Sequence, residues 1–275
     1  MYERYWQLDR NPFDDDGDLR GFFRSETHQA TLLKLRYLFE NGKGTGLLAG
    51  PTGIGKTYLI EVLKQQLGES YGPFLHLVFP QMSPAELLAW LAVELGADAA
   101  VIGSDKAGRD RTVREIDAQL RKFSELGRHP VIVVDEAHLI EDFQVFQALR
   151  LLLNFQHGKK CRFSLIFSGQ HELLGTVRRL EQLEERLSVK CLLRPLAAEE
   201  TAGYVACRLE AAGAPRPIFQ PDAMRPLHEL SGGIPRRINR LCDLALLVGF
   251  ADESESISAE QVEAVAEELT AVVAD

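Results

Sequence analysis

A glycine-rich segment at residues 50–57 has the residue types and spacing needed to hold a polyphosphate. Gly50-Pro51-Thr52-Gly53-Ile54-Gly55-Lys56-Thr57 fits the pattern G-x-x-x-x-G-K-[ST], with an apolar run before it and a helical pattern after it. Its glycines allow backbone N–H groups to converge on phosphate oxygens, and the start of the following helix adds positive partial charge. Lys56 can reach the β- and γ-phosphates, and the Thr57 hydroxyl can bind Mg²⁺. The predicted nucleotide-binding residues are Gly50, Pro51, Thr52, Gly53, Ile54, Gly55, Lys56, Thr57 and Tyr58.

Two adjacent carboxylates form the second chemical feature. Asp135 and Glu136 follow a β-branched apolar run, and acids at the end of a buried strand are costly unless they meet a cation or a reacting group. Because ligands bind at the carboxyl ends of parallel strands, we expect Asp135 to help hold Mg²⁺ and Glu136 to polarise the attacking water. Solvated strand-end charges are the alternative. The same segment spells the D-E-A-H of a helicase family, but no second nucleotide-binding half follows, so His138 is interpreted as structural or supporting.

Alternating strand and helix patterns must position these residues. Apolar runs predict strands at about 46–49, 74–79, 130–134, 163–167 and 190–193, with helices predicted at about 26–41, 56–67, 84–95, 110–126, 143–155 and 172–187. No hairpin signal separates the strands, so a parallel sheet covered by helices is expected. After Pro195 only helical segments follow, at about 198–212, 221–230, 234–248 and 258–271. The pattern therefore predicts an α/β domain over residues 1–195 and a helical domain over residues 196–275.

Motifs outside these two features extend along nearly the whole chain. They are Tyr5-Trp6-x-Leu8 with Asn11-Pro12-Phe13, Phe22-Phe23 with Ser25-x-x-His28, Phe167-Ser168-Gly169-Gln170 with Glu172-Leu173, and Ser231-Gly232-Gly233-Ile234-Pro235-Arg236. With them the chain resembles a AAA+ ATPase, and specifically the ATPase part of the ExeA/GspA-type proteins of the general secretion pathway. The resemblance implies an α/β fold, a P-loop AAA+ three-layer sandwich with a parallel sheet, followed by a small all-helical lid domain. It also implies that ATP and Mg²⁺ are the cofactors.

The resemblance assigns further roles to polar residues. Gln170 is the first choice for sensor 1, the residue that touches the γ-phosphate or the water, and Ser168 is the second; a polar turn is the alternative. Arg186 holds the place of an arginine finger acting on a neighbouring subunit's nucleotide, although Glu184 and Glu185 also allow a surface ion pair. Arg236 resembles sensor 2, the arginine by which the helical domain responds to the phosphates of the nucleotide. Weaker candidates for the two arginine roles are Arg178 and Arg179 for the finger, and Arg237 and Arg240 for sensor 2.

Three aromatic residues near the N-terminus have two interpretations. Tyr5, Trp6 and Phe13 either line an adenine pocket or pack in a core.

Composition limits the class of protein and its partners. The chain has 275 residues, 45% of them hydrophobic, and no signal-peptide or membrane-spanning pattern, so we expect a folded cytoplasmic protein. Its formal net charge of −9 disfavours a constitutive nucleic-acid binder. Residues 251–275 carry eight of the acidic residues and no basic residue, so the other part of the chain is closer to neutral. DNA is therefore not the favoured partner, but it is not excluded. The four cysteines lack metal-binding spacing and are interpreted as reduced.

The favoured function combines these expectations. It is MgATP hydrolysis coupled to conformational change in an oligomer, a ring or filament, that serves a secretion, pilus or other envelope-associated assembly. One alternative is an ATP-dependent DNA-binding regulator of the transposition type, and another is a slow nucleotide switch that recruits partners. Small basic clusters at 159–162 and 236–240 fit a solvated face as well as they fit phosphate contacts.

Overall fold

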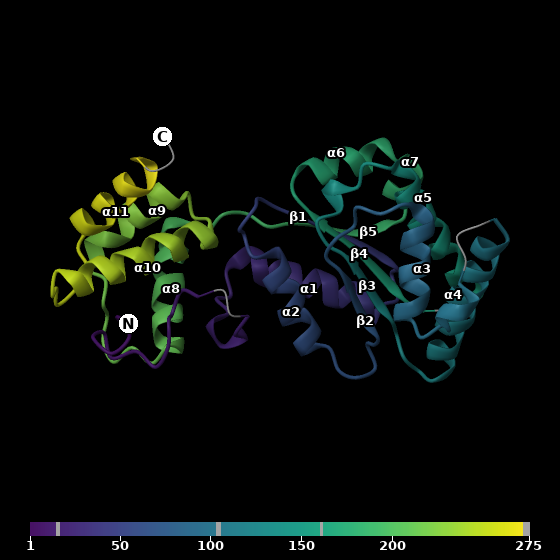
Figure 1. Cartoon of the computed structure of the whole chain (residues 1–275), viewed down its shortest axis with the longest axis horizontal. Helices are drawn as coiled ribbons and strands as arrows, with labels where there is room; N and C mark the ends of the chain where they lie inside the picture. The colour runs from purple at the N-terminus through teal and green to yellow at the C-terminus, as the bar shows by residue number, and fades with distance from the viewer. Residues whose placement is uncertain (15–16, 103–105, 160–161, 272–275) are drawn as a thin grey trace. The chain divides into compact units, whose positions relative to one another are not determined.

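The computed structural model describes residues 1–14, 17–102, 106–159 and 162–271, and Figure 1 shows its elements. Packing divides the chain into two compact units. The sheet unit comprises Ala30–Gly50 and Leu59–Leu193, and the helical unit comprises Met1–Gln29, Pro51–Tyr58 and Arg194–Asp275. The last change of unit lies beside the predicted boundary at residue 195. However, the N-terminal segment and the glycine-rich loop of residues 51–58, called the phosphate loop below, belong to the helical unit rather than to the sheet unit.

Within the described residues, five parallel strands form the sheet, in the spatial order β2-β3-β4-β1-β5. They are β1 (Thr45–Ala49), β2 (Phe74–Leu77), β3 (Val131–Val134), β4 (Ser164–Gly169) and β5 (Leu187–Leu192). Every residue of the three central strands is buried, as expected for apolar runs covered on both faces. The predicted parallel α/β fold is confirmed. Because the strands are parallel, their carboxyl ends share one edge of the sheet.

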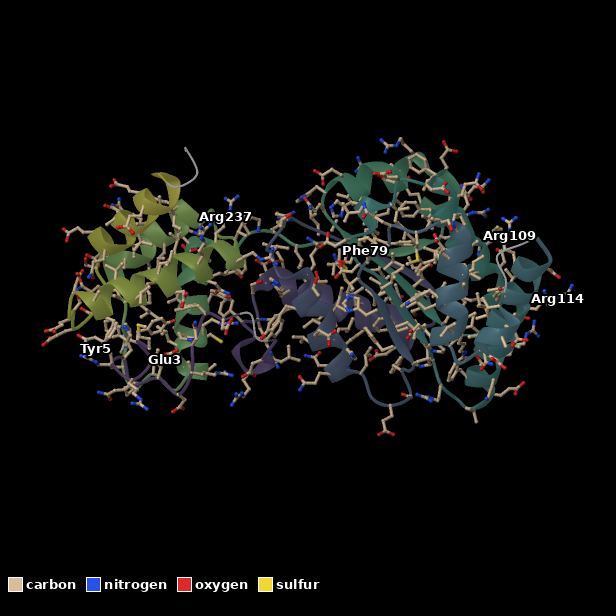
Figure 2. All side chains as sticks on the ribbon, in the orientation of Figure 1. Glu3, Tyr5, Phe79, Arg109, Arg114 and Arg237 are labelled. Atoms are coloured by element: carbon tan, nitrogen blue, oxygen red, sulfur yellow. The ribbon has the colours of Figure 1, made fainter. Side chains whose placement is uncertain are left out.

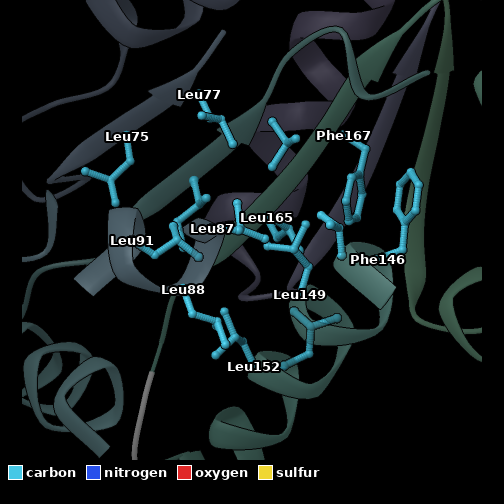
Figure 3. Close-up of a cluster of buried hydrophobic side chains, with 14 of the residues drawn as sticks. Leu75, Leu77, Leu87, Leu88, Leu91, Phe146, Leu149, Leu152, Leu165 and Phe167 are labelled. Carbon is cyan, nitrogen blue, oxygen red and sulfur yellow. The ribbon is translucent and has the colours of Figure 1, made fainter. Parts of the chain in front are cut away.

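One face of the sheet is covered by α3 (Pro84–Glu94), α4 (Lys106–Glu125) and α5 (Phe143–Leu152). Figure 3 shows the core of this layer, in which side chains of α3 and α5 meet Leu165 and Phe167 of β4. Phe146 of α5 packs against Phe167 with ring centroids 5.6 Å apart. Alternate residues of each strand point to this layer, so the sheet supplies half of its apolar side chains to it.

The other face is covered by α1 (Glu26–Glu40) and α2 (Lys56–Gln66), as Figure 1 shows. Leu38 of α1 lies so close to β1 that a Cβ placed on Gly46 would be 3.0 Å from its Cδ1 atom. In β3, Val131 and Val133 are fully buried outside the apolar cluster of the first face. Two helical layers therefore enclose one sheet, which is the three-layer arrangement expected from the sequence.

Shorter elements complete the sheet unit. They are α6 (Glu172–Arg179), α7 (Glu181–Glu184) and the 3-10 turns η2 (Ala99–Val101), η3 (Ala137–Leu139) and η4 (Leu153–Lys159). The predicted start of α3 is a capping box, because the Ser83 hydroxyl accepts from the Glu86 N–H and the Glu86 carboxylate accepts from the Ser83 N–H.

The helical unit contains α8 (Ala198–Ala211), α9 (Met224–Ser231), α10 (Pro235–Ala251) and α11 (Ala259–Ala271), with η1 (Leu19–Gly21) and η5 (Pro221–Ala223). Its core also takes Tyr2, Trp6, Leu8 and Phe13 from the N-terminal segment, which Figure 1 draws in purple beside α8. Trp6 donates its Nε1–H to the Leu246 carbonyl oxygen at 3.0 Å.

Core packing is thus the role the structure gives to the aromatic N-terminus. Trp6 and Phe13 are each 4% exposed, and Tyr5, labelled in Figure 2, packs edge-on against Trp6 with centroids 4.9 Å apart. The Tyr5 hydroxyl donates to the Ser254 carbonyl oxygen at 2.8 Å. The pairing of these rings with α10 explains why a segment far away in sequence joins the helical unit.

Cys191 and Cys242 are buried thiols, and Cys207 is partly buried. Burial raises the pKa of Cys191 to about 11, so this thiol stays protonated and inert, as the sequence indicates. Lys160 of the predicted 159–162 basic cluster and Cys161 lie outside the described residues. In the described part of the chain, no helix combines the length and apolar character needed to cross a membrane.

Candidate active site

The segment 51–58 is a tight loop that runs into the N-terminus of α2. Gly53 has φ +76° and Gly55 has φ +95°, a region of backbone conformation that L side chains rarely adopt. Lys56 begins α2 with its side chain buried, and its Nζ donates to the Pro51 carbonyl oxygen at 3.0 Å. The loop therefore surrounds a positive charge beside a helix N-terminus, which is the combination that binds phosphate.

The other predicted loop residues differ in exposure. Ile54 is fully buried, whereas the side chains of Thr52 and Thr57 are exposed. Tyr58 donates its hydroxyl to the Asp18 carbonyl oxygen at 2.6 Å, so its side chain ties the loop to the N-terminal segment. Thr57 lies on the first turn of α2.

The start of α10 touches the phosphate loop. The Arg236 backbone N–H donates to the Gly53 carbonyl oxygen at 3.1 Å, and a Cβ on Gly53 would lie 2.8 Å from the Arg236 Cβ. Gly53 is thus required both by its φ and by this approach. The Arg236 side chain is exposed, as are those of Arg237 and Arg240 one and four positions further along; Figure 2 labels Arg237 on the surface of the helical unit. Of the three candidates for sensor 2, Arg236 is the one whose backbone N–H bonds to Gly53.

Asp135 follows β3 directly and is buried, with 2% of its side chain exposed. Its Oδ1 accepts the Glu136 N–H at 3.0 Å, and its Oδ2 lies 3.2 Å from Nε2 of His76 on β2. The same ring faces a second carboxylate, because His76 Nδ1 is 3.5 Å from Oε1 of Glu61 on α2. Both carboxylate oxygens of Asp135 therefore have fixed donors, which holds the group in one orientation.

Glu136 has an unusual backbone. Its φ of +47° and ψ of +33° are left-handed, a conformation that costs free energy for a residue with a side chain and tends to persist at functional sites. The side chain is 38% exposed, and its Oε2 lies 3.4 Å from Nδ1 of His138. The turn thus separates the two acids: Asp135 is buried and anchored, while Glu136 is directed outward where a water could meet it.

The two candidates for sensor 1 lie in different environments. Ser168, inside β4, is fully buried, and within the described residues its Oγ has no hydrogen-bond partner. Gln170 follows β4, is partly exposed, and directs its backbone N–H toward Nδ1 of His138 at 3.4 Å. A buried hydroxyl without a partner is costly, and it is found where a ligand or water supplies the missing bond.

Arg186 lies between α7 and β5 and is exposed. Its Nη2 donates to Oδ1 of Asn154 at 3.2 Å, whereas the Glu184 carboxylate pairs with Lys190 at 2.6 Å. Over the described residues, Arg186 forms no ion pair, so the surface pair with neighbouring acids that the sequence allowed is not formed. The bond of its guanidinium to Asn154 uses one of several N–H groups.

These residues fit a magnesium nucleotide better than a free metal ion. In the part of the chain that the structure describes, no three His, Cys, Asp or Glu side chains gather to hold a metal by themselves. Mg²⁺ is commonly held by one or two protein oxygens together with phosphate oxygens and water. Thr57 and Asp135 are each a residue type that can supply an oxygen to Mg²⁺, and within the described residues the Ser168 hydroxyl has no hydrogen-bond partner.

The sequence assigned no role in the site to two histidines, His76 and His28. His76 lies within an ordinary strand pattern and carries no signal of its contact with Asp135. His28 belongs to the Ser25-x-x-His28 motif, which marked the resemblance but gave no chemistry; it is buried against the phosphate loop.

Comparisons with known proteins find a matching family, a related sequence and related folds. The model of the family described as AAA domain matches residues 40–177, which include the phosphate loop, Asp135 and Glu136. General secretion pathway protein A of Aeromonas hydrophila is 34% identical over 276 residues, which cover 99% of this chain and 49% of that protein. The chain thus spans about half the length of this curated relative.

Solved structures show the same fold. The Aeropyrum pernix ORC2 protein, solved as ADPNP-ADP complexes, matches with a TM-score of 0.66 and 17% identity over 94% of this chain and 71% of that chain. The ORC1 protein of the same organism, solved in complex with DNA, matches with a TM-score of 0.66 and 18% identity over 94% of this chain and 68% of that chain. At this identity the likeness concerns the fold alone.

Proposed function

The chain belongs to the AAA domain family, and from that premise we propose that it is an ATPase whose hydrolysis of MgATP drives conformational change within an oligomer. The observation that carries this proposal is the hydrogen bond from the Arg236 N–H to the Gly53 carbonyl oxygen at 3.1 Å. Within the helical unit it joins the phosphate-binding loop to α10, so a change in the loop on hydrolysis would be transmitted directly to α10. We further propose that it acts in the cytoplasm for a secretion, pilus or other envelope-associated assembly, supported by its likeness to general secretion pathway protein A.

Each residue has a distinct task in the proposed reaction. Loop N–H groups and Lys56 bind and orient the phosphates, while Thr57 and Asp135 are the residues that would hold Mg²⁺, which neutralises charge on phosphate oxygens. Glu136 orients the attacking water and takes up its proton. Ser168 or Gln170 contacts the γ-phosphate or that water.

Two arginines complete the proposed site. Arg236 couples the presence or loss of the γ-phosphate to the position of the helices in the helical unit. Arg186 acts on the nucleotide of a neighbouring copy, where its positive charge stabilises the transition state. Activity should therefore depend on assembly, and the rate per subunit should rise with protein concentration.

The proposal is tested by Lys56→Ala with Lys64→Ala as its matched control. Lys64 lies on the same helix, half-exposed, 3.7 Å from Glu61 and away from the loop. We expect Lys56→Ala to weaken ATP binding about tenfold or more, since a charge-assisted contact to phosphate is lost, and Lys64→Ala to bind normally. Calorimetry gives the affinities, phosphate release gives turnover, and sedimentation with ATP or ADP gives the assembly state. Equal ATP affinity in both variants contradicts the proposal.

A second function has one observation in its favour. Arg236, Arg237 and Arg240 are exposed on one end of α10 and form no ion pair within the described residues, which suits contact with DNA phosphates. An ATP-switched DNA-binding regulator would bind duplex DNA with strong salt dependence and differently with ATP than with ADP. Absence of salt-dependent binding in both states excludes it. Slow turnover with nucleotide-dependent partner binding would instead indicate a switch.

A further inference from the structure

The turn between α9 and α10 holds two consecutive glycines in left-handed conformations. Gly232 has φ +61° and Gly233 has φ +68°. A Cβ on Gly232 would meet no atom of the described residues within 4 Å, whereas a Cβ on Gly233 would overlap the Leu196 carbonyl oxygen and lie 3.1 Å from the Leu196 nitrogen. The left-handed backbone therefore favours glycine at both positions, but only Gly233 is also required by a neighbouring backbone.

The contact of Gly233 with Leu196 joins two main chains directly. The Leu196 N–H donates to the Gly233 carbonyl oxygen at 2.9 Å, and the Leu196 side chain is buried in the apolar core of the helical unit. On its other side, Gly233 donates its own N–H to the Ser231 hydroxyl oxygen at 3.1 Å. Gly233 is thus hydrogen-bonded through both its N–H and its C=O, which fixes the position of the chain just before α10.

The segment from Gly233 to Arg236 is short and has little conformational freedom. The ring of Pro235, the first residue of α10, fixes its own φ, and a residue before proline is restricted to extended conformations, which Ile234 adopts with φ −88° and ψ 116°. At the far end of the segment the Arg236 N–H meets the Gly53 carbonyl oxygen, and the Ile234 Cγ2 lies 3.4 Å from the position of a Cβ on Gly53. A displacement of Gly233 is therefore passed on to the contact with the phosphate loop.

We propose that Gly233 is a positioning residue of the nucleotide site: its close packing on the Leu196 main chain sets the start of α10 and thereby places Arg236 against the phosphate loop. All of these residues belong to the helical unit. The inference rests on the proposed function, in which Arg236 responds to the γ-phosphate. A side chain at position 233 would push the main chain away from Leu196 and carry Arg236 with it.

The test compares Gly233→Ala with Gly232→Ala. Both substitutions place a methyl group on a left-handed backbone, so they have a similar conformational cost, but only the one at position 233 meets Leu196. The readout is the ratio of the Kd for ADP to the Kd for a non-hydrolysable ATP analogue, each measured with Mg²⁺ by calorimetry, because this ratio reports the contact with the γ-phosphate. We expect Gly233→Ala to lower the ratio about tenfold, and Gly232→Ala to keep it within about twofold of the original chain.

A double variant separates positioning from a general structural effect. Arg236→Ala should lower the same ratio about tenfold, and Gly233→Ala added to it should lower the ratio less than about twofold further, because the side chain to be positioned is already gone. A merely structural defect would weaken the binding of ADP and of the ATP analogue alike and leave the ratio unchanged. Losses that multiply in the double variant overturn the proposal, as does an unchanged ratio in Gly233→Ala or in Arg236→Ala, or an equal loss in Gly232→Ala.

Thermal unfolding shows whether each variant folds. If Gly233→Ala does not fold, Ser231→Ala carries the test, because it removes the hydroxyl that accepts the Gly233 N–H without adding an atom to the contact with Leu196. Ser231→Ala should lower the ratio about threefold, and an unchanged ratio then overturns the proposal. Failure of the proposed function is distinguishable, because Lys56→Ala would then bind ATP like the original chain.

Discussion

Nε2 of His76 lies 3.2 Å from Oδ2 of Asp135, so an imidazole on the edge strand orients the carboxylate proposed to hold Mg²⁺. We expect His76→Phe to raise the Mg²⁺ concentration needed for tight ATP binding about tenfold, as loss of a residue that orients a metal ligand commonly does. His76→Asn retains an N–H donor, so the Mg²⁺ concentration it needs should lie between those of the original chain and of His76→Phe. Titrations of nucleotide binding with Mg²⁺, repeated in EDTA, give the measurement. Loss of binding in EDTA as well would show that His76 acts on the loop or the fold instead.

Glu136→Gln should bind ATP as tightly as the original chain and hydrolyse it at least about 100-fold more slowly, because the amide cannot accept the proton of the attacking water. The substitution keeps the side-chain shape and the left-handed turn, so the stability should be nearly unchanged. Single-turnover phosphate release checks the rate, and calorimetry checks the affinity. Turnover near the original rate would remove Glu136 from the role of base.

Arg186→Ala should lower turnover by about 1,000-fold while ATP affinity is kept, as expected for an arginine finger. Mixing this variant with Lys56→Ala should restore part of the activity, because each protein supplies what the other lacks. Arg179→Ala is the control: Arg179 is exposed and stacks over Phe143 at 6.0 Å. If Arg179→Ala rather than Arg186→Ala loses turnover, the finger is Arg179, and no rescue on mixing argues against action between copies.

Ser168→Ala should change the free energy of unfolding by less than about 1 kcal/mol, because the hydroxyl it removes has no partner among the described residues. If that hydroxyl contacts the nucleotide, kcat should nevertheless fall about tenfold. Gln170→Ala is the matched comparison at the partly exposed position two residues on. Denaturant unfolding and steady-state kinetics measure both effects. A loss of kcat confined to Gln170→Ala would return sensor 1 to that residue.

His129 should make the protein less stable in mild acid. The ring is buried beside Tyr71, with centroids 5.6 Å apart, and burial lowers its pKa to about 4. Between pH 6.5 and 4, His129 is protonated in the unfolded chain but neutral in the folded chain. The free energy of unfolding therefore decreases as the pH is lowered through this range, by at most about 3 kcal/mol from this group. Above pH 6.5 the contribution is constant.

Urea unfolding at several pH values tests this dependence. His129→Gln should flatten the decline, while His171→Gln, which changes an exposed histidine, should leave it as steep as in the original chain. An equally steep decline in His129→Gln would assign the acid sensitivity to other groups.

The parts of the fold and site with a local signal were predictable. Strands β1, β3 and β4 are continuous apolar runs, and the loop at 50–57 needs glycine at particular positions, so both appear in the sequence. The sequence predicts that Asp135 and Glu136 act together as two acids at the end of a strand. Only the structure shows that Asp135 is buried and that Glu136 lies on a left-handed turn. Backbone conformation at a non-glycine residue leaves no trace in composition.

Contacts between segments far apart in sequence were not predictable. Ser168 and Gln170 are both polar residues at the end of a strand, and their difference in burial depends on packing with other elements. The same holds for His76 and Asp135, which are brought together by the pairing of β2 with β3. The grouping of Trp6 with Leu246 depends on tertiary packing that no local pattern encodes.

The burial of Tyr2, Trp6, Leu8 and Phe13 among α8–α11 has a consequence for how the chain is made. In chain order these residues precede the strands of the sheet, and the helices that cover them follow those strands, so during synthesis of the sheet these four side chains lack their packing partners. The sheet unit can complete its own core in that interval, but the helical unit can close only after the last helices have emerged. Until α8–α11 have been synthesised, these apolar side chains stay exposed to solvent, and exposed apolar side chains of this kind are what chaperones bind.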